Sequence, residues 1–278
     1  VWDKKKHKFL NLLKMLFLIR RKKYQKVVNL HRFASSGFLT AFSGAVEKTG
    51  FDKNPLSFLF TTKVKHDIGD HNGSRKHEME RNHELIKSFT GETPARPVLY
   101  PSAADMEAVK QYKQERYITI SPASVWFTKQ YPKEKWVEFI NALPKDLTIY
   151  LNGGPGDAAL ATEIRQMADP FLKIINLCGK LNFLCSAALM KDAAMNYVND
   201  SAPLHIASAV NAPVAAVFCS TVPAFGFTPL SDKSFVIETP VALDCRPCGL
   251  HGYRSCPKGH FKCAMLVTKE QLLQPLHV

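Results

Sequence analysis

Three short polar stretches of this sequence could together hold a phosphorylated ligand. Lys129 carries an ammonium group that can neutralise a diphosphate and favour its departure. Asp157 ends the turn at residues 152–157, and a carboxylate after the second strand of a nucleotide-binding α/β domain commonly accepts the ribose hydroxyls. A helix N-cap is an equally good interpretation of Asp157. Asp200 opens the third stretch, at residues 200–205.

The third stretch predicts a phosphate site at the start of a helix. Ser201 is a candidate N-cap, and Pro203 fits the first helical turn because its missing N–H removes no internal hydrogen bond. The free N–H groups of that turn and the positive end of the helix dipole attract an anion. Taken alone, this stretch is typical of a capped helix without a ligand. Lys129 taken alone is typical of a solvated surface charge. The three stretches in combination favour a nucleotide diphosphate.

The elements that would position these residues follow a regular alternation after residue 116. Five apolar runs predict strands, and the segments between them have the period of helices. Strands that alternate with helices predict right-handed crossovers and an α/β fold with a parallel, doubly wound sheet. If the strand order is 3-2-1-4-5, the ligand crevice lies between the first and fourth strands. The predicted strands are residues 117–120, 147–151, 173–177, 195–198 and 214–218, and the predicted helices are 133–143, 157–168, 182–191 and 202–210.

The first third of the chain predicts a second, incomplete α/β domain. The proline- and glycine-containing segment 90–97 is typical of a linker, so we expect domains at residues 1–93 and 94–278. Because the first contains too few strand and helix units, and residues 1–3 are typical of the tail of a strand, we expect an N-terminally truncated domain. Its predicted elements are helices at 10–24, 35–46 and 84–89, a strand at 26–31, a strand or turn at 48–51, and a polar loop at 63–82.

Composition excludes some classes of protein and leaves several partners open. A chain of 278 residues with 46% hydrophobic and 22% charged residues is neither disordered nor fibrous. Its net charge of +13 predicts an acidic partner, either nucleic acid, an anionic membrane or a phosphorylated small molecule. The sequence contains no run of eighteen apolar residues, so no transmembrane helix is expected. The basic segment 4–26 is interpreted as an amphipathic helix, either resting on anionic lipid or presenting a solvated face.

Seven cysteines form two groups. Cys178, Cys185 and Cys219 fall in apolar runs and are predicted to be reduced core thiols. Four more, at 245, 248, 256 and 263, offer enough thiolates for a tetrahedral zinc site. The second half of this cluster lacks the short C-x2-C spacing of a zinc ribbon, which favours a compact loop with reduced thiols or a disulfide that forms only on oxidation. We therefore predict no metal and no other cofactor.

Several of these segments resemble one bacterial family. The run 199–207, the segments 212–218 and 220–223, the loop around Lys129, the turn 153–157 and the cysteine tail 245–263 are together similar to the ADP-heptose:lipopolysaccharide heptosyltransferases of glycosyltransferase family 9. The resemblance spans most of the chain. It implies a GT-B fold with two Rossmann-like domains, in which the C-terminal domain binds the donor and the N-terminal domain the acceptor.

The resemblance also implies roles for individual residues. Lys129 and Asp200 would be the catalytic groups, with Lys129 on the donor diphosphate, Asp157 on the ribose, and Asp200 with the following turn on the donor sugar and phosphates. Ala202 stands where many relatives have glycine. The implied substrate-binding set is Ser121, Ser124, Thr128, Lys129, Asp157, Asp200, Ser201, Ala202, Leu204 and His205.

The implied function is inverting transfer of heptose from ADP-heptose to the lipopolysaccharide inner core. The implied partners are an ADP-sugar donor and a lipopolysaccharide acceptor, with no nucleic acid. The implied location is the cytoplasm, with peripheral contact at the inner face of the inner membrane as an option. The family's acceptor base lies in a loop near the start of the first domain, and no such loop is present in this sequence. Three alternatives stay open: an inactive fragment, a non-catalytic nucleotide- or nucleic-acid-binding module, and a transferase that uses another nucleotide sugar.

Overall fold

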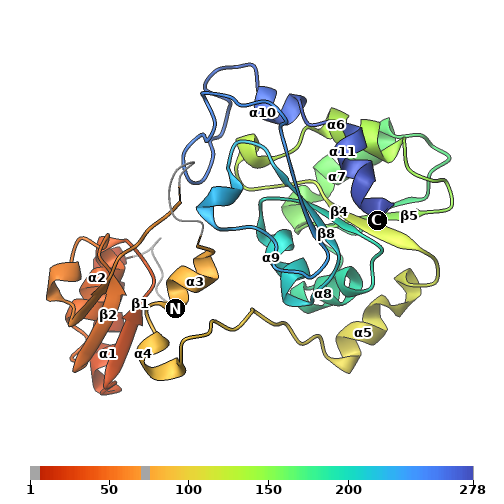
Figure 1. Ribbon diagram of the computed structural model, residues 1–278. Coiled ribbons are helices and arrows are strands. Elements are labelled where there is room, and N and C mark those ends of the chain that lie inside the picture. Colours follow the sequence, from red (N-terminus) through yellow and green to blue (C-terminus); the bar gives the residue numbers. More distant parts are fainter. Residues whose placement is uncertain (1–6, 70–75, 278) are drawn as a thin grey trace. The chain divides into compact units, whose positions relative to one another are not determined.

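The computed structural model describes residues 7–69 and 76–277 and divides into two compact units (Figure 1). Unit 1 ends at Ala95 and unit 2 begins at Arg96, two residues beyond the predicted division. Parts of the predicted basic segment, residues 4–6, and of the predicted polar loop, residues 70–75, lie outside the described residues.

Unit 2 is built on a six-stranded parallel sheet. Its order, β6-β5-β4-β7-β8-β9, confirms the predicted parallel, doubly wound sheet and meets the condition of a 3-2-1-4-5 order, and it contains a sixth strand that was not predicted. The sixth strand, β9, was missed because it follows a long irregular segment instead of a helix. The strands are β4 (Tyr117–Ser121), β5 (Thr148–Leu151), β6 (Ile174–Asn176), β7 (Asn196–Asn199), β8 (Val214–Phe218) and β9 (Ser234–Glu238).

Both faces of this sheet are covered, which explains why its central strands are apolar throughout. In β8, Ala215 and Val217 pack into one hydrophobic cluster while Ala216 and Phe218 pack into another. Helices α6 (Lys133–Ile140), α7 (Ala158–Met167) and α11 (Lys269–Leu273) lie on one side of the sheet (Figure 1). On the other side lie α5 (Ala103–Val109), α8 (Phe183–Lys191) and α9 (Ala202–Ala209), and the short α10 (Lys262–Met265) lies in the cysteine tail.

Helix α6 shows how the sequence specifies these elements. Pro132 precedes its first turn, and Trp136, Val137 and Ile140 are buried on one face of the helix. The Trp136 ring meets the rings of Tyr131 and Phe139 at centroid distances of 5.0 and 6.2 Å. The helix ends at Ile140, three residues before the predicted end.

Unit 1 contains a three-stranded parallel sheet with the order β1-β2-β3. The predicted loop at 63–82 is partly wrong, because strand β3 (Thr62–Val64) covers its first two residues and helix α3 (Glu78–His83) covers its last five. His77 caps α3 by accepting the Met79 N–H at Nδ1 over 3.1 Å, an unusual cap that sequence patterns do not indicate. The predicted helix at 84–89 is displaced, and that at 35–46 is shorter. The elements are α1 (Lys8–Arg21), β1 (Lys26–Asn29), α2 (Ala34–Ala41), β2 (Glu47–Phe51), β3 (Thr62–Val64), α3 (Glu78–His83) and α4 (Lys87–Thr90).

Helix α1 differs from the other long helices because none of its residues is buried. Its apolar side chains Phe9, Leu13 and Phe17 recur every four residues and are exposed, so they share one outward stripe. Among the described residues, no helix is both long enough and apolar enough to cross a membrane.

Candidate functional site

A cavity of about 430 Å³ opens at the carboxyl ends of the strands of unit 2. It lies where the sequence analysis placed the crevice, since loops after β4, β5 and β7 contribute to it, and strand order reverses between β4 and β7. The cavity is lined by Ser121, Ala123, Ser124, Val125, Asn152, Gly153, Gly154, Asp157, Leu181, Phe183, Ser186, Met190, Ser201, Ala202, Pro203 and Ile206.

Two buried polar groups in the cavity wall have no partner within the described part of the chain. Ser121 is 2% exposed and Asn152 is 5% exposed, and neither the Ser121 hydroxyl nor the Asn152 Nδ2 makes a hydrogen bond. A buried polar group without a partner costs free energy unless a ligand or water completes it. Both groups therefore indicate hydrogen-bonding positions for a polar ligand.

Apolar side chains form much of the remaining wall. Leu181, Phe183, Met190 and Ile206 reach the cavity from α8, its preceding loop and α9. Ligand sites of this kind combine apolar walls with a few well-placed polar groups, and the apolar part suits a flat ring such as a nucleobase. None of these four residues was predicted, because periodicity marks them only as helix or loop residues.

Asp157 lines the cavity and also holds its own turn. Its Oδ2 accepts the Gly154 N–H at 2.8 Å, and its side chain does not cap α7. Asp157 therefore occupies the N-cap position of α7, as the alternative predicted, but without a capping hydrogen bond from its side chain to that helix. Gly153 permits this geometry, because a Cβ there would lie 2.7 Å from the same Oδ2. The contact of Asp157 with a ribose stays a prediction.

Lys129 and Asp200 form an ion pair beside the cavity. Their Nζ and Oδ2 atoms are 2.7 Å apart, and the side chains are only 15% and 7% exposed. The Thr221 hydroxyl donates to the same Oδ2 over 2.6 Å. Neither Lys129 nor Asp200 is among the lining residues, but Ser201, the next residue in the chain, is. Removing two charges from water is costly, so a pair held this way is stable only because each partner compensates the other.

Helix α9 begins at Ala202 as predicted, with Ser201 at the N-cap position. Its side chain does not cap the helix, because the Ser201 hydroxyl contacts the Asn199 carbonyl oxygen at 3.3 Å. That part of the prediction is wrong. The first turn of α9 faces the cavity through Ala202 and Pro203 without a side-chain cap. Pro203 has no N–H and the Leu204 N–H donates to the Ser201 carbonyl at 3.1 Å, so this turn offers an anion the Ala202 N–H and the positive end of the helix dipole.

Asn199 fixes the loop that follows β4. Its Oδ1 accepts the Tyr131 N–H at 2.9 Å, and its Nδ2 donates to the Pro122 carbonyl at 2.8 Å. Asn199 ends β7 and is fully buried, so it ties the loop that carries Ser121 and Ser124 to the neighbouring strand. The sequence analysis quoted this residue in a motif but assigned it no role.

Besides Lys129 and Asp200, three predicted ligand residues lie outside the cavity lining. Thr128 is buried, and its Oγ1 accepts the Tyr253 N–H at 2.7 Å. Leu204 packs in the hydrophobic cluster beneath α9, and the His205 ring lies 6.3 Å from that of Phe227. Their contacts with a ligand stay predictions.

The thiols near the site are protonated at neutral pH. Burial, with a smaller contribution from the Asp157 charge, raises the pKa of Cys178 to about 11. Burial likewise raises the pKa of Cys263 to about 11, and that of Cys219 well above its usual value. Among the described residues, no three His, Cys, Asp or Glu side chains are arranged as metal ligands.

A parallel doubly wound sheet with a cavity at its switch point defines unit 2 as a Rossmann-like domain of the nucleotide-binding kind. The model for glycosyltransferase family 9 (heptosyltransferase) matches residues 13–251. This chain therefore belongs to glycosyltransferase family 9. Lipooligosaccharide heptosyltransferase 2 of Haemophilus influenzae is 24% identical over 78% of this chain and 66% of its own length.

Solved structures of low identity show the same fold. The Escherichia coli ADP-heptose lipopolysaccharide heptosyltransferase II is 21% identical, with a TM-score of 0.73 over 97% of this chain and 80% of that one. The E. coli heptosyltransferase WaaC with ADP is 17% identical, with a TM-score of 0.66 over 98% and 78%. The fold is therefore of the GT-B type with Rossmann-like domains. The chain spans just under two thirds of the Haemophilus relative.

Proposed function

We propose that this protein transfers heptose from ADP-heptose to the inner core of lipopolysaccharide with inversion at the anomeric carbon. The observation that carries the proposal is the cavity at the switch point, with the uncapped start of α9 in its wall and the Lys129–Asp200 pair beside it, in a chain of family 9. The similar solved structure of E. coli WaaC is a heptosyltransferase with ADP, which supports ADP as the nucleotide.

Each part of the donor would use a different part of the site. The apolar wall around Leu181 and Phe183 would hold the base, and Asp157 would lie near the ribose. The Ala202 N–H and the positive end of the α9 dipole would bind the diphosphate. In the transfer step an acceptor hydroxyl attacks the anomeric carbon, the bond to the phosphate oxygen breaks, and ADP departs with its negative charge stabilised by the Lys129 ammonium. No described residue is assigned as the base that takes the hydroxyl proton.

We also propose that α1 rests on an anionic membrane, at the cytoplasmic face of the inner membrane where a lipopolysaccharide precursor would be met. Its stripe of Phe9, Leu13 and Phe17 is exposed, and its last turn carries Arg20 and Arg21 with no acidic residue in its first turn. An apolar stripe flanked by cations is the pattern of helices that lie in a lipid interface. Sedimentation with anionic vesicles tests this proposal.

Calorimetric titration tests the donor assignment. We expect the full chain to bind ADP more tightly than UDP or GDP and to bind a short oligonucleotide weakly. Tight oligonucleotide binding without a response to ADP would instead identify a nucleic-acid-binding module. Preference for UDP or GDP would indicate a transferase that uses another nucleotide sugar.

A transfer assay separates binding from catalysis. We expect ADP release when ADP-heptose and a heptose-deficient lipopolysaccharide core are supplied together. Binding of ADP without release in that assay would show that the chain retains the donor site but not the complete catalytic machinery.

A further inference from the structure

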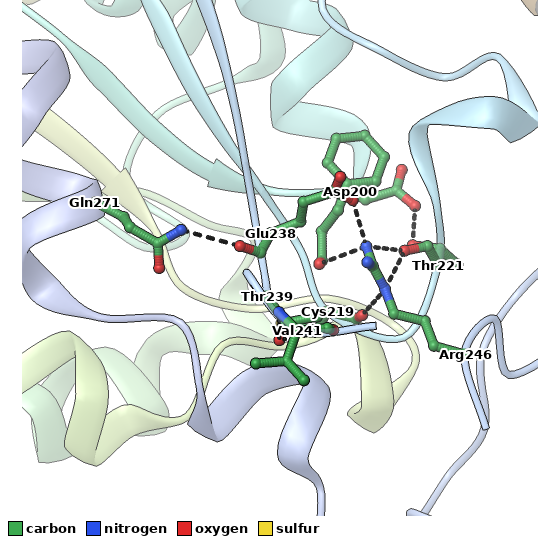
Figure 2. Close-up of polar contacts among 9 residues, drawn as sticks. Asp200, Cys219, Thr221, Glu238, Thr239, Val241, Arg246 and Gln271 are labelled. Atoms are coloured by element: carbon green, nitrogen blue, oxygen red, sulfur yellow. Dashed lines mark hydrogen bonds and ion pairs between the residues drawn. The ribbon is translucent and has the colours of Figure 1, made fainter. Parts of the chain in front are cut away.

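The segment 245–253 follows the last strand and packs directly behind the loops that carry Lys129 and Asp200. We call residues 245–253 the C-terminal strap. Arg246 joins the strap to the loops behind the site, and the Arg246 side chain is only 9% exposed. Figure 2 shows the guanidinium group among the ends of β8 and β9. None of the strap residues lines the cavity, so any effect of the strap on a ligand must pass through other residues.

Arg246 ties together the turn that follows β8. Its Nε donates to the Cys219 carbonyl at 2.8 Å, and its Nη2 donates to the Thr221 carbonyl at 2.8 Å (Figure 2). The Glu238 carboxylate lies 2.7 Å from Nη2 and balances the charge. The planar guanidinium holds several acceptors at fixed relative positions, which an ammonium group cannot do.

Thr221 connects Arg246 to the Lys129–Asp200 ion pair. Its carbonyl is held by Arg246, and its hydroxyl donates to the Asp200 Oδ2 at 2.6 Å. The same Oδ2 is 2.7 Å from the Lys129 ammonium. A continuous series of charge-assisted contacts therefore runs from Arg246 through Thr221 and Asp200 to Lys129.

The other end of the strap supports Lys129 from its own loop. The Thr128 N–H donates to the Tyr253 carbonyl at 3.1 Å, and the Tyr253 N–H donates to the Thr128 hydroxyl at 2.7 Å. Gly252 has a φ of +76°, and a Cβ there would lie 2.8 Å from Thr128 Oγ1 and 3.1 Å from Lys129 Cγ. Only glycine fits this close approach without displacing the Lys129 loop.

We propose that the C-terminal strap positions the Lys129–Asp200 pair for the diphosphate of the donor, with Arg246 as the positioning residue. This inference rests on the proposed donor site. The strap holds one partner of the pair through Thr221 and the other through Thr128, and so fixes where the positive charge of Lys129 lies. It contributes nothing to the part of the cavity that would hold the base.

The division between base and diphosphate gives the test its selectivity. ADP and adenosine share the base and ribose but differ in the diphosphate, so calorimetry with both ligands isolates the contribution of the ion pair. In the full chain, we expect Arg246→Met to weaken ADP binding about tenfold, the effect of a lost charge-assisted contact. Adenosine binding is expected to change less than twofold. Arg246→Lys should give an intermediate loss, because it restores the charge beside Glu238 but not both carbonyl contacts.

A second variant and a matched control keep the test decisive. Thr221→Val removes the hydroxyl donated to Asp200 at nearly unchanged volume, and it should reproduce the selective loss of ADP affinity even if Arg246→Met does not fold. Arg96→Met removes an exposed arginine of the same unit, 2.7 Å from Asp232, and should leave both affinities unchanged.

The outcomes separate the strap from the donor site itself. If the unaltered chain does not bind ADP, the proposed function fails. If the unaltered chain binds ADP and folded Arg246→Lys and Thr221→Val bind it equally well, the positioning role is overturned. An equal loss for ADP and adenosine would also overturn it, since a general structural role affects both ligands.

Discussion

The two units differ in how completely they bury their apolar residues. In unit 2, three hydrophobic clusters fill the space on both faces of the sheet. In the described part of unit 1, the buried apolar side chains are Ala45, Phe51, Phe60 and Leu85, while α1 buries none of its residues. Burial of apolar surface is the main favourable contribution to folding, so unit 2 should carry most of the stability.

This difference also separates two kinds of function. A rigid, filled core holds the cavity and the Lys129–Asp200 pair in fixed positions, as binding of a small ligand requires. An exposed apolar stripe gains free energy only when another surface covers it. The donor site proposed above lies in unit 2, and the membrane contact proposed above lies in unit 1.

The largest expected effect tests the difference in burial. Trp136→Ala should lower the free energy of unfolding by about 3–5 kcal/mol, because Trp136 is completely buried. Phe17→Ala, in exposed α1, should change it by less than about 0.5 kcal/mol. Urea denaturation followed by circular dichroism gives both values. Equal losses in the two variants would show that α1 is as well packed as α6.

Breaking the buried ion pair should have the next largest effect. Lys129→Met leaves the Asp200 carboxylate without its cation and should cost about 3 kcal/mol, the lower end for a buried pair. Adding Asp200→Asn should recover much of this stability but none of the lost ADP affinity. Denaturation and calorimetry on the single and double variants measure the two effects. Full ADP affinity in the double variant would contradict the role assigned to the pair.

A smaller effect is expected for membrane association. Phe17→Ser removes one exposed ring of the α1 stripe and should weaken binding to anionic vesicles about tenfold, the value of one buried phenylalanine side chain. Phe171→Ser is the matched control, since Phe171 is 80% exposed in unit 2 and Phe17 is 66% exposed in unit 1. Cosedimentation with anionic and neutral vesicles measures the binding. Equal effects of the two substitutions would remove α1 as the contact surface.

A further expected effect is a loss of stability at alkaline pH. The folded pKa values of Cys178 and Cys263 are raised to about 11 by burial, above the ordinary thiol value near 9. Above pH 9 the unfolded state therefore binds fewer protons, and the free energy of unfolding falls until the folded thiols titrate near pH 11. All seven cysteines lie in unit 2, so the loss belongs to that unit. Urea midpoints from pH 8 to 11 measure it. Cys178→Ala should flatten the decline, and an unchanged slope would contradict this explanation.

The sequence predicted regular elements better than irregular ones. The alternation of apolar runs was sufficient for five strands of unit 2 and for their parallel sheet, because parallel strands buried on both faces have a distinctive composition. It was insufficient for β9 and α3. The first follows irregular chain, and the second is capped by His77, so neither has the usual local signal.

Part of the site was also within reach of the sequence. The loops with Ser121, Asp157 and Ser201 meet at one cavity, as expected for turns at the same edge of a parallel sheet. Thr128 and Leu204 were predicted as ligand residues but do not line the cavity, because the direction of a side chain depends on packing. The Lys129–Asp200 contact joins residues 71 positions apart in the chain, and no local pattern encodes such a distance.

The amino-acid sequence by itself determined the α/β class, the family and the loops that carry the polar residues, since composition, periodicity and motif order are local properties. Tertiary structure alone decided which of those residues share a cavity and which are paired with each other. It also decided that Arg246, a residue with no predicted role, lies behind Thr221 and Asp200. These outcomes depend on long-range packing, in which the free energy of each buried polar group is set by partners distant in the chain.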